Sequence, residues 1–164
     1  MIVSNGIVGS VDSVEGATVT LDFIDVPWAD AAKRLLRRRT NGGHDFALSM
    51  QHSQYLFHGA VLVNNEDHTV VVRRPKELAL IVDLSQTGSL SDVVRQAALI
   101  GHAFGNQHVP VEVDGRCILV PMLSSESLMM KTVRDLELGG LALRFDHVRL
   151  GASRPLFVTG HTHE

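Results

Sequence analysis

The sequence predicts an α+β protein in which a small β-rich N-terminal domain precedes a domain that combines four strands with two helices. Short runs of alternating apolar residues, separated by turn residues, fill the first half of the chain. Longer stretches with helical spacing begin only after Arg73-Arg74-Pro75, where the pattern changes. We therefore place domains at residues 1–75 and 76–148, and we expect residues 149–164 to form a flexible tail.

The first domain is expected to be a small sandwich or barrel. Glu15-Gly16 and Asn41-Gly42-Gly43 are turn signals, and Pro27 ends the strand pattern before it. The segment Trp28–Arg39 has short helical spacing, so one or two helical turns are expected there. Alternating apolar residues predict the strands of this domain: Ile2–Val8, Gly9–Val14, Ala17–Val26, Asp45–Met50, Val61–Asn64 and Thr69–Arg73.

The second domain reads as β-α-β-β-α-β, which is the ferredoxin-like order. One helix, capped by Ser89 or Ser91, is expected to run to Phe104. A second helix, capped by Ser124 or Ser125, is expected to end near Gly139. Asp114-Gly115 is a favoured two-residue hairpin turn. Strands are predicted at four places: Glu77–Leu84, Val109–Val113, Arg116–Pro121 and Leu141–Val148.

Composition narrows the classes of protein to which the chain could belong. No stretch reaches the about 20 apolar residues that a membrane span needs, and the N-terminus lacks the pattern of a signal peptide. The formal net charge of −3 gives no global attraction to nucleic acid. The single cysteine, Cys117, excludes an internal disulfide framework. We therefore expect a cytoplasmic protein that binds neither membranes nor nucleic acid.

The residue with the clearest chemical interest is His108. It lies between the helix that is expected to end at Phe104 and the strand Val109–Val113, so structure on both sides should orient its imidazole. Gly105 and Asn106 tolerate the left-handed backbone that ends many helices. Histidine is the commonest metal ligand in proteins. On these grounds alone, the simpler interpretation is that His108 only interacts favourably with the negative end of the helix dipole.

The stretch Gly105–Pro110, which reads G-N-Q-H-V-P, resembles the G-N-R-H-x-P motif of the urease accessory metallochaperones called UreE, with Gln107 in place of the usual Arg. The chain also ends in G-H-T-H-E, similar to the histidine-bearing tails of that family. The resemblance implies a nickel-binding metallochaperone, not an enzyme, that delivers Ni²⁺ for assembly of the urease active site. It also implies a β-rich N-terminal domain joined to a ferredoxin-like metal-binding domain.

By the same resemblance, the expected metal ligands are His108, His161 and His163, and the expected cargo is Ni²⁺, with Zn²⁺ or Cu²⁺ able to bind in vitro. The implied partners are the urease GTPase accessory protein and the urease apoprotein assembly complex. Where many relatives carry further histidines, this chain has L-S-S-E-S-L, so peripheral metal sites of that kind are not expected. His102 is expected to lie on the helix surface or at an interface rather than to bind the ion.

Ligand counting predicts a homodimer. One fixed imidazole per chain cannot hold Ni²⁺ tightly, because this ion takes four to six donors. A two-fold axis would bring two copies of His108 together around one ion, and the tail histidines and water would complete its coordination. Apolar faces around Phe104, Val109 and Met122 are candidates for the surface that the dimer buries.

Four further histidines, His44, His52, His58 and His68, belong to the first domain and have no regular spacing. We expect them to be solvated loop residues. Two alternative functions remain open. A peptide-binding or protein-interaction module would use the β-rich domain, with incidental histidines. A Zn-dependent hydrolase would need a closed set of ligands, but the chain has no H-E-x-x-H pair.

Overall fold

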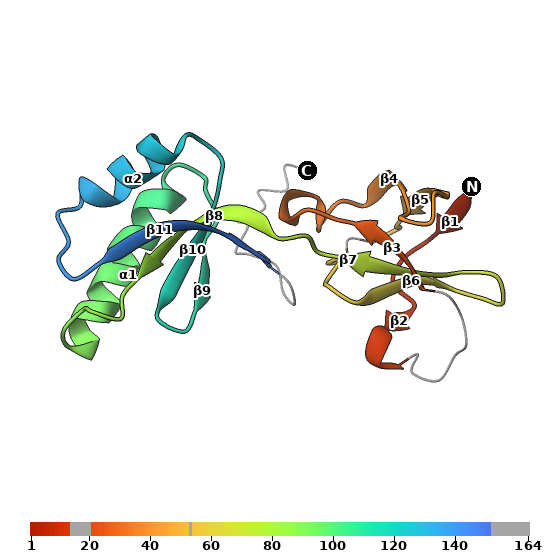
Figure 1. The fold of residues 1–164 in the computed structure, drawn as a ribbon, viewed down its shortest axis with the longest axis horizontal. Helices are drawn as coiled ribbons and strands as arrows, with labels where there is room; N and C mark the ends of the chain where they lie inside the picture. Colours follow the sequence, from red (N-terminus) through yellow and green to blue (C-terminus); the bar gives the residue numbers. More distant parts are fainter. Residues whose placement is uncertain (14–20, 53, 152–164) are drawn as a thin grey trace. The chain divides into compact units, whose positions relative to one another are not determined.

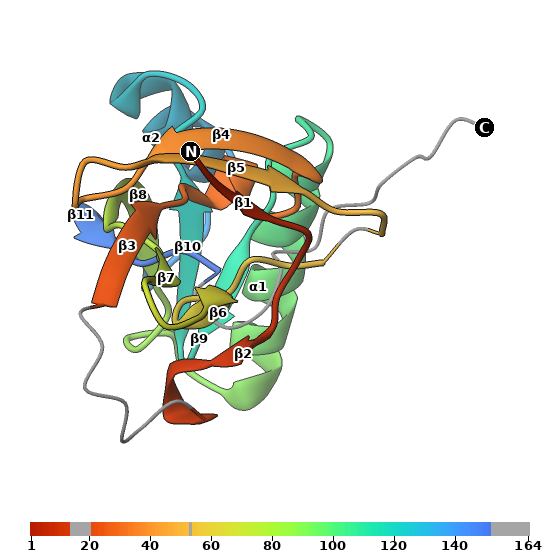
Figure 2. The same cartoon turned by 90° about the vertical axis from the view of Figure 1, so that its right-hand side faces the viewer.

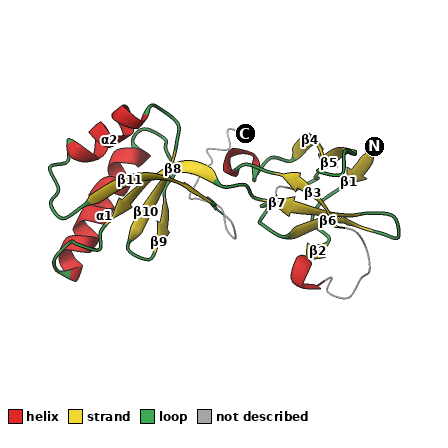
Figure 3. Cartoon of the chain, in the orientation of Figure 1, coloured by secondary structure: helices red, strands yellow, loops and turns green. Residues whose placement is uncertain are grey.

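The computed structural model describes residues 1–13, 21–52 and 54–151. They form a mixed α+β protein, mostly of strands with two α-helices, which confirms the α+β part of the predicted fold class (Figures 1 and 3). The described residues divide into two compact units. Unit 1 is Met1–Pro75 together with Gly151, and unit 2 is Lys76–Leu150. No described helix is long and apolar enough to cross a membrane.

Unit 1 consists of a three-stranded sheet of order β1-β5-β4 and a four-stranded sheet of order β2-β6-β7-β3. Figure 2 shows β4 and β5 side by side in the first sheet. Alternate side chains of both sheets meet in one apolar core, which includes Phe46 from β5, Ile24 from β3 and Val70 from β7. The strands are β1 (Ile2–Ser4), β2 (Gly9–Ser10), β3 (Leu21–Asp25), β4 (Leu35–Arg39), β5 (Asp45–Ser49), β6 (Ala60–Asn64) and β7 (Thr69–Arg73).

The prediction of one or two helical turns within Trp28–Arg39 is wrong for most of that segment. Only Trp28–Asp30 forms a single 3-10 turn, and Leu35–Arg39 is strand β4, paired antiparallel with β5. Leu36 is the only buried residue of β4. The strand lies at the edge of its sheet, where a row of arginines can stay solvated and discourages pairing with another chain.

The first predicted strands are also too long. β1 ends at Ser4, and the segment expected to continue β2 turns into a 3-10 helix at Val11–Ser13. The proposed turn at Glu15-Gly16 lies outside the described residues, as does the start of the strand predicted from Ala17.

Unit 2 has the element order strand, helix, strand, strand, helix, strand. These are β8 (Glu77–Asp83), α1 (Leu90–Gly105), β9 (Glu112–Asp114), β10 (Cys117–Pro121), α2 (Glu126–Arg134) and β11 (Ala142–Val148). Their sheet has the order β11-β8-β10-β9, and every neighbouring pair is antiparallel.

Both helices cover one face of this sheet. Leu80, Val82 and Leu84 alternate along and just after β8 and pack with Ile118 and Val120 of β10. The same core takes Ile100 and Phe104 from α1 and Met129 and Val133 from α2. Each of these pairs is spaced by four residues, so each helix presents one apolar stripe to the sheet.

The ends of the helices are set by capping. The Ser89 side chain accepts from the amide of Asp92 and the Asp92 carboxylate accepts from the amide of Ser89, which is a capping box at the start of α1. Ser125 caps α2, which ends at Arg134 rather than near Gly139. The β9–β10 turn is Gly115-Arg116, one residue later than the predicted Asp114-Gly115, because Asp114 pairs with Cys117.

Candidate metal site

His108 occupies the turn that ends α1, and its backbone has a positive φ of 56°. The amide of Val109 donates to the carbonyl of Phe104 at 3.0 Å, and the amide of His108 donates to that of Gly105 at 2.9 Å. These two bonds define a Schellman ending, in which the residue before the last donor adopts the left-handed conformation. That residue is His108. The prediction that Gly105 or Asn106 would hold this position is wrong, since Asn106 is still helical, with φ of −62°.

The position of the left-handed residue follows from packing. In a Schellman ending, the residue after it commonly makes an apolar contact with the last turn of the helix. Here those residues are Val109 and Phe104: Phe104 belongs to the core of unit 2, and half-buried Val109 packs against that core. The packing of Val109 therefore favours the ending at His108, although glycine or asparagine would adopt that backbone more easily.

The turn is tied to both helices. The Gln107 side chain donates from Nε2 to the carbonyl of Ala103 and to Oγ1 of Thr132 on α2, each at 3.3 Å. The neutral side-chain amide of Gln107 thus contacts both α1 and α2. His102 is exposed on the last turn of α1, with Nε2 3.0 Å from Nδ2 of Asn106. Its predicted location on the helix surface is confirmed, and its absence from the metal shell stays a prediction.

His108 itself is exposed, so its imidazole is accessible to an ion or to another chain. The other two predicted ligands, His161 and His163, lie outside the described residues. Among residues 1–13, 21–52 and 54–151, no three His, Cys, Asp or Glu side chains form a group that could hold a metal ion. Within this part of the chain, His108 therefore supplies a single oriented donor.

One residue proposed for the dimer surface is not available to it. Phe104 is only 1% exposed and belongs to the core of unit 2, so it cannot lie in an interface. Val109 and Met122 pack against the same core but are half-buried, and they remain candidates.

One association of histidines was not predicted from the sequence. His44 and His68, expected to be separate loop residues, lie with ring centroids 5.0 Å apart in unit 1. Their separation in sequence gave no signal of this contact. Each directly precedes a strand, β5 and β7 respectively, but those two strands belong to different sheets, and only the packing of the sheets brings the two residues together.

Comparison with known proteins identifies what the chain resembles. It is 26% identical over 130 residues to the urease accessory protein UreE of Edwardsiella ictaluri, and 28% identical over 130 residues to that of Yersinia aldovae. Both alignments cover 77% of this chain but only 58% and 56% of the relatives, so the chain spans less than two thirds of their length. The UreE of Halalkalibacterium halodurans is 23% identical over 159 residues, which cover 97% of this chain and 96% of the relative. No family model matches the chain. The resemblance to UreE predicted from the sequence is confirmed.

Proposed function

We propose that the protein is a urease accessory protein that binds Ni²⁺ and delivers it for assembly of the urease active site. The observation that carries this proposal is the similarity to UreE proteins, which extends over almost the whole chain in one relative. Those relatives are named as accessory proteins of an enzyme, which agrees with the prediction that this chain is not itself an enzyme. The proposed setting is the cytoplasm.

His108 is the proposed nickel ligand on which the site is built. Its backbone is fixed by the Schellman bonds, and its side chain is exposed, so the imidazole is oriented without being enclosed. Neutral imidazole suits Ni²⁺. An exposed, incomplete ligand set is what a carrier needs, because the ion must leave again. His161 and His163 are proposed to add donors when the ion is bound.

The proposed assembly is a homodimer in which two copies of His108 hold one ion near the two-fold axis. Half-buried Val109 and Met122 are proposed for the contact surface, together with Leu128, which is 50% exposed. Leu128 lies one turn before Thr132, the α2 residue that contacts Gln107 beside His108. Further proposed partners are the urease GTPase accessory protein and the urease apoprotein complex.

Unit 2 is proposed to be a ferredoxin-like domain. Its element order and its sheet order, with the two central strands β8 and β10 flanked by β11 and β9, support this assignment.

Calorimetric titration with Ni²⁺, combined with sedimentation and metal analysis, tests the binding part of the proposal. We expect one tightly held ion per two chains, a site abolished by His108→Ala with the dimer intact, and a normal site in His102→Ala. Deletion of Gly160–Glu164 should weaken that site or remove a second, looser one. A metal-loaded monomer, or equal losses from His102→Ala and His108→Ala, would contradict the model of two His108 residues around one ion.

Delivery is tested separately, by activation of urease apoprotein with its accessory GTPase at limiting Ni²⁺. The wild-type chain should raise the yield of active urease, and His108→Ala should not. Equal activation by both chains would refute a delivery role for His108.

A further inference from the structure

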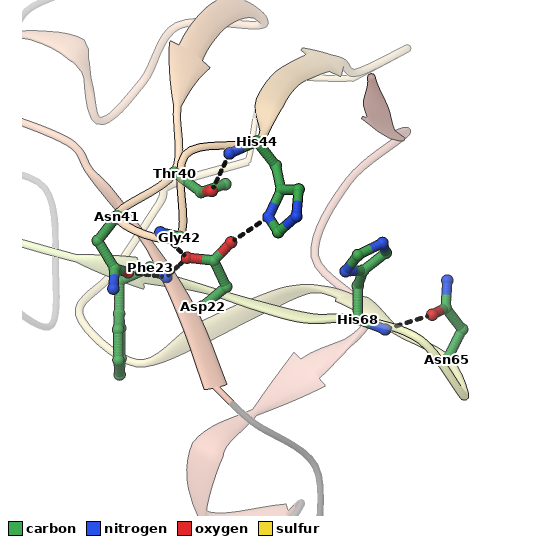
Figure 4. Close-up of polar contacts among 8 residues, drawn as sticks. All are labelled: Asp22, Phe23, Thr40, Asn41, Gly42, His44, Asn65 and His68. Carbon is green, nitrogen blue, oxygen red and sulfur yellow. Dashed lines mark hydrogen bonds and ion pairs between the residues drawn. The ribbon is translucent and has the colours of Figure 1, made fainter.

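Three segments of unit 1 converge around a pair of histidines. His44 ends the turn between β4 and β5, His68 ends the turn between β6 and β7, and Asp22 lies on β3 (Figure 4). The two imidazoles lie next to each other, with ring centroids 5.0 Å apart and an interplanar angle of 62°. Both line a hollow of about 520 Å³ at the surface of the unit, together with Met1, Asp45 and Asn65.

The Asp22 carboxylate orients His44. Its Oδ2 lies 3.1 Å from Nδ1 of His44, while its Oδ1 accepts from the amides of Gly42 at 2.8 Å and Phe23 at 2.9 Å. The backbone amide of His44 also donates to Oγ1 of Thr40 at 3.0 Å. The Asp22 side chain is only 10% exposed, whereas the His44 side chain is 50% exposed. The mostly buried Asp22 carboxylate therefore holds the Nδ1 edge of the His44 ring, while the opposite edge of the ring is open to solvent.

The hydrogen bonds of Asp22 determine the tautomer of His44. Oδ1 of Asp22 already accepts from the amides of Gly42 and Phe23, and Oδ2 faces Nδ1 of His44. A carboxylate in this position accepts hydrogen bonds and has none to donate. Nδ1 of His44 must donate to it, so in the neutral ring the lone pair is on Nε2. A carboxylate behind a histidine in this way is the usual support of a metal-ligating imidazole.

We propose that His44 and His68 form a second site for a divalent transition-metal ion, with Nε2 of His44 and one ring nitrogen of His68 as ligands and Asp22 as the positioning residue. This site is separate from the one built on His108, and it does not depend on the proposed function.

The ring separation fits a shared ion. A metal about 2.1 Å from one nitrogen of each ring lies roughly 3.2 Å from each ring centroid. Two such rings have centroids roughly 4.5 Å apart for a right angle at the metal and roughly 5.2 Å apart for a tetrahedral angle. The observed 5.0 Å lies between these values.

The site has the character of a weak, exchangeable one. Among the described residues, no third His, Cys, Asp or Glu completes a ligand group with the two histidines, so water fills the remaining positions. Two nitrogen donors suit Cu²⁺, Ni²⁺ and Zn²⁺ more than Mg²⁺ or Ca²⁺.

The test uses the full chain carrying His108→Ala, His161→Ala and His163→Ala, so that the ligands of the other proposed site are absent. Titration with nickel chloride is followed by calorimetry and by paramagnetic broadening of amide NMR signals. We expect one ion per chain, with broadening first at residues 43–45 and 67–69. Adding His44→Ala or His68→Ala should weaken binding at least tenfold. His52→Ala, which removes an exposed histidine from the same unit, should leave binding unchanged.

A second set of variants tests the role of Asp22. In Asp22→Asn the amide group can donate to Nδ1 of His44, which moves the ring proton to Nε2 and removes the free lone pair. We expect a tenfold to hundredfold loss of nickel affinity, the range typical for loss of such a support, with a change of tautomer visible in the imidazole nitrogen shifts. Asn41→Ala removes a different bond, to the amide of Phe23, and should change neither property.

The proposal fails if nickel binding in this background survives both His44→Ala and His68→Ala, or if no ion binds and no signal near residues 43–45 broadens. Failure of the His108 site would be seen instead in the wild-type titration and the urease activation assay, so the two proposals can fail independently. Backbone NMR spectra of each variant show whether unit 1 remains folded. If unit 1 does not remain folded in His68→Ala, His68→Gln provides a milder substitution at the same position.

Discussion

Replacing His108 by glycine should raise the free energy of unfolding of the metal-free protein, although it removes the proposed nickel ligand. His108 has φ of 56°, a backbone conformation that costs a residue with a side chain about 1–2 kcal/mol. Glycine adopts it freely but loses about 0.5–1 kcal/mol through the greater entropy of the unfolded chain. Because the side chain is exposed, its removal sacrifices little packing. The net gain should be about 0.5–1 kcal/mol, and His108→Ala should gain nothing comparable.

Urea unfolding followed by far-ultraviolet circular dichroism, with EDTA present, measures this difference. His147 provides the matched control, because it is an exposed histidine on β11 and is not among the residues with positive φ. There the order should reverse, with His147→Ala more stable than His147→Gly, since glycine weakens a strand. If His108→Gly is no more stable than His108→Ala in EDTA, the strain argument is wrong.

The same experiment with Ni²⁺ connects strain to the proposed function. A ligand that binds only the native state stabilises it in proportion to the logarithm of its concentration over its dissociation constant. The wild-type chain should therefore gain stability as Ni²⁺ is added, and His108→Gly should gain less. At saturating Ni²⁺ the ranking of the two proteins should invert. Parallel gains in both would mean that His108 does not contribute to nickel binding.

Two other predictions concern local structure. Gly101→Ala on α1 should stabilise the protein by about 0.5–1 kcal/mol in urea unfolding, because a Cβ there meets nothing within 4 Å. Gly140→Ala should destabilise it, because φ is 74° and a Cβ would lie 2.9 Å from the carbonyl oxygen of Gln86. The opposite order of stabilities would refute both expectations. Asp22, whose folded-state pKa is lowered, should contribute stability above its unfolded pKa of about 3.9 and lose that contribution as pH falls through the lower, folded value. Thermal unfolding of Asp22→Asn should consequently be less sensitive to pH between about 5 and 2 than that of the wild type, and identical pH profiles would count against the lowered pKa.

The parts of the fold that the sequence predicted well are those with strong local signals. The apolar stripe of α1 places core residues four positions apart, and the capping residue Ser89 pairs with Asp92 three positions later. Both signals are local in sequence, and both appear as expected. Leu35–Arg39 carried no such signal, because its single buried side chain is compatible with either a helix or a strand. Its pairing with β5, a contact between distant residues, decided the outcome.

The candidate sites divide in the same way. The location of His108 directly after the helix was predicted, because helix ends have local signatures. The strand expected at Val109–Val113, however, begins only at Glu112 and ends at Asp114. The left-handed backbone of His108 was not predicted, because the ending follows the packing of half-buried Val109 against the core that contains Phe104, rather than the preferences of Gly105 and Asn106. The meeting of His44 and His68 depends on the packing of two sheets, which spacing along the chain does not encode.

The two histidine sites also orient their imidazoles by different means, and this predicts different behaviour. His44 is held through its side chain by an ionised carboxylate, which fixes the tautomer and leaves Nε2 as the donor. The main constraint on His108 comes from its backbone, in a turn where half-buried Val109 packs against the core, so the position of the ring is defined more firmly than its tautomer. In the proposed dimer, the second chain and the tail must complete the shell around His108. Release of the ion there can follow from rearrangement of those other donors, while the turn that presents His108 stays folded.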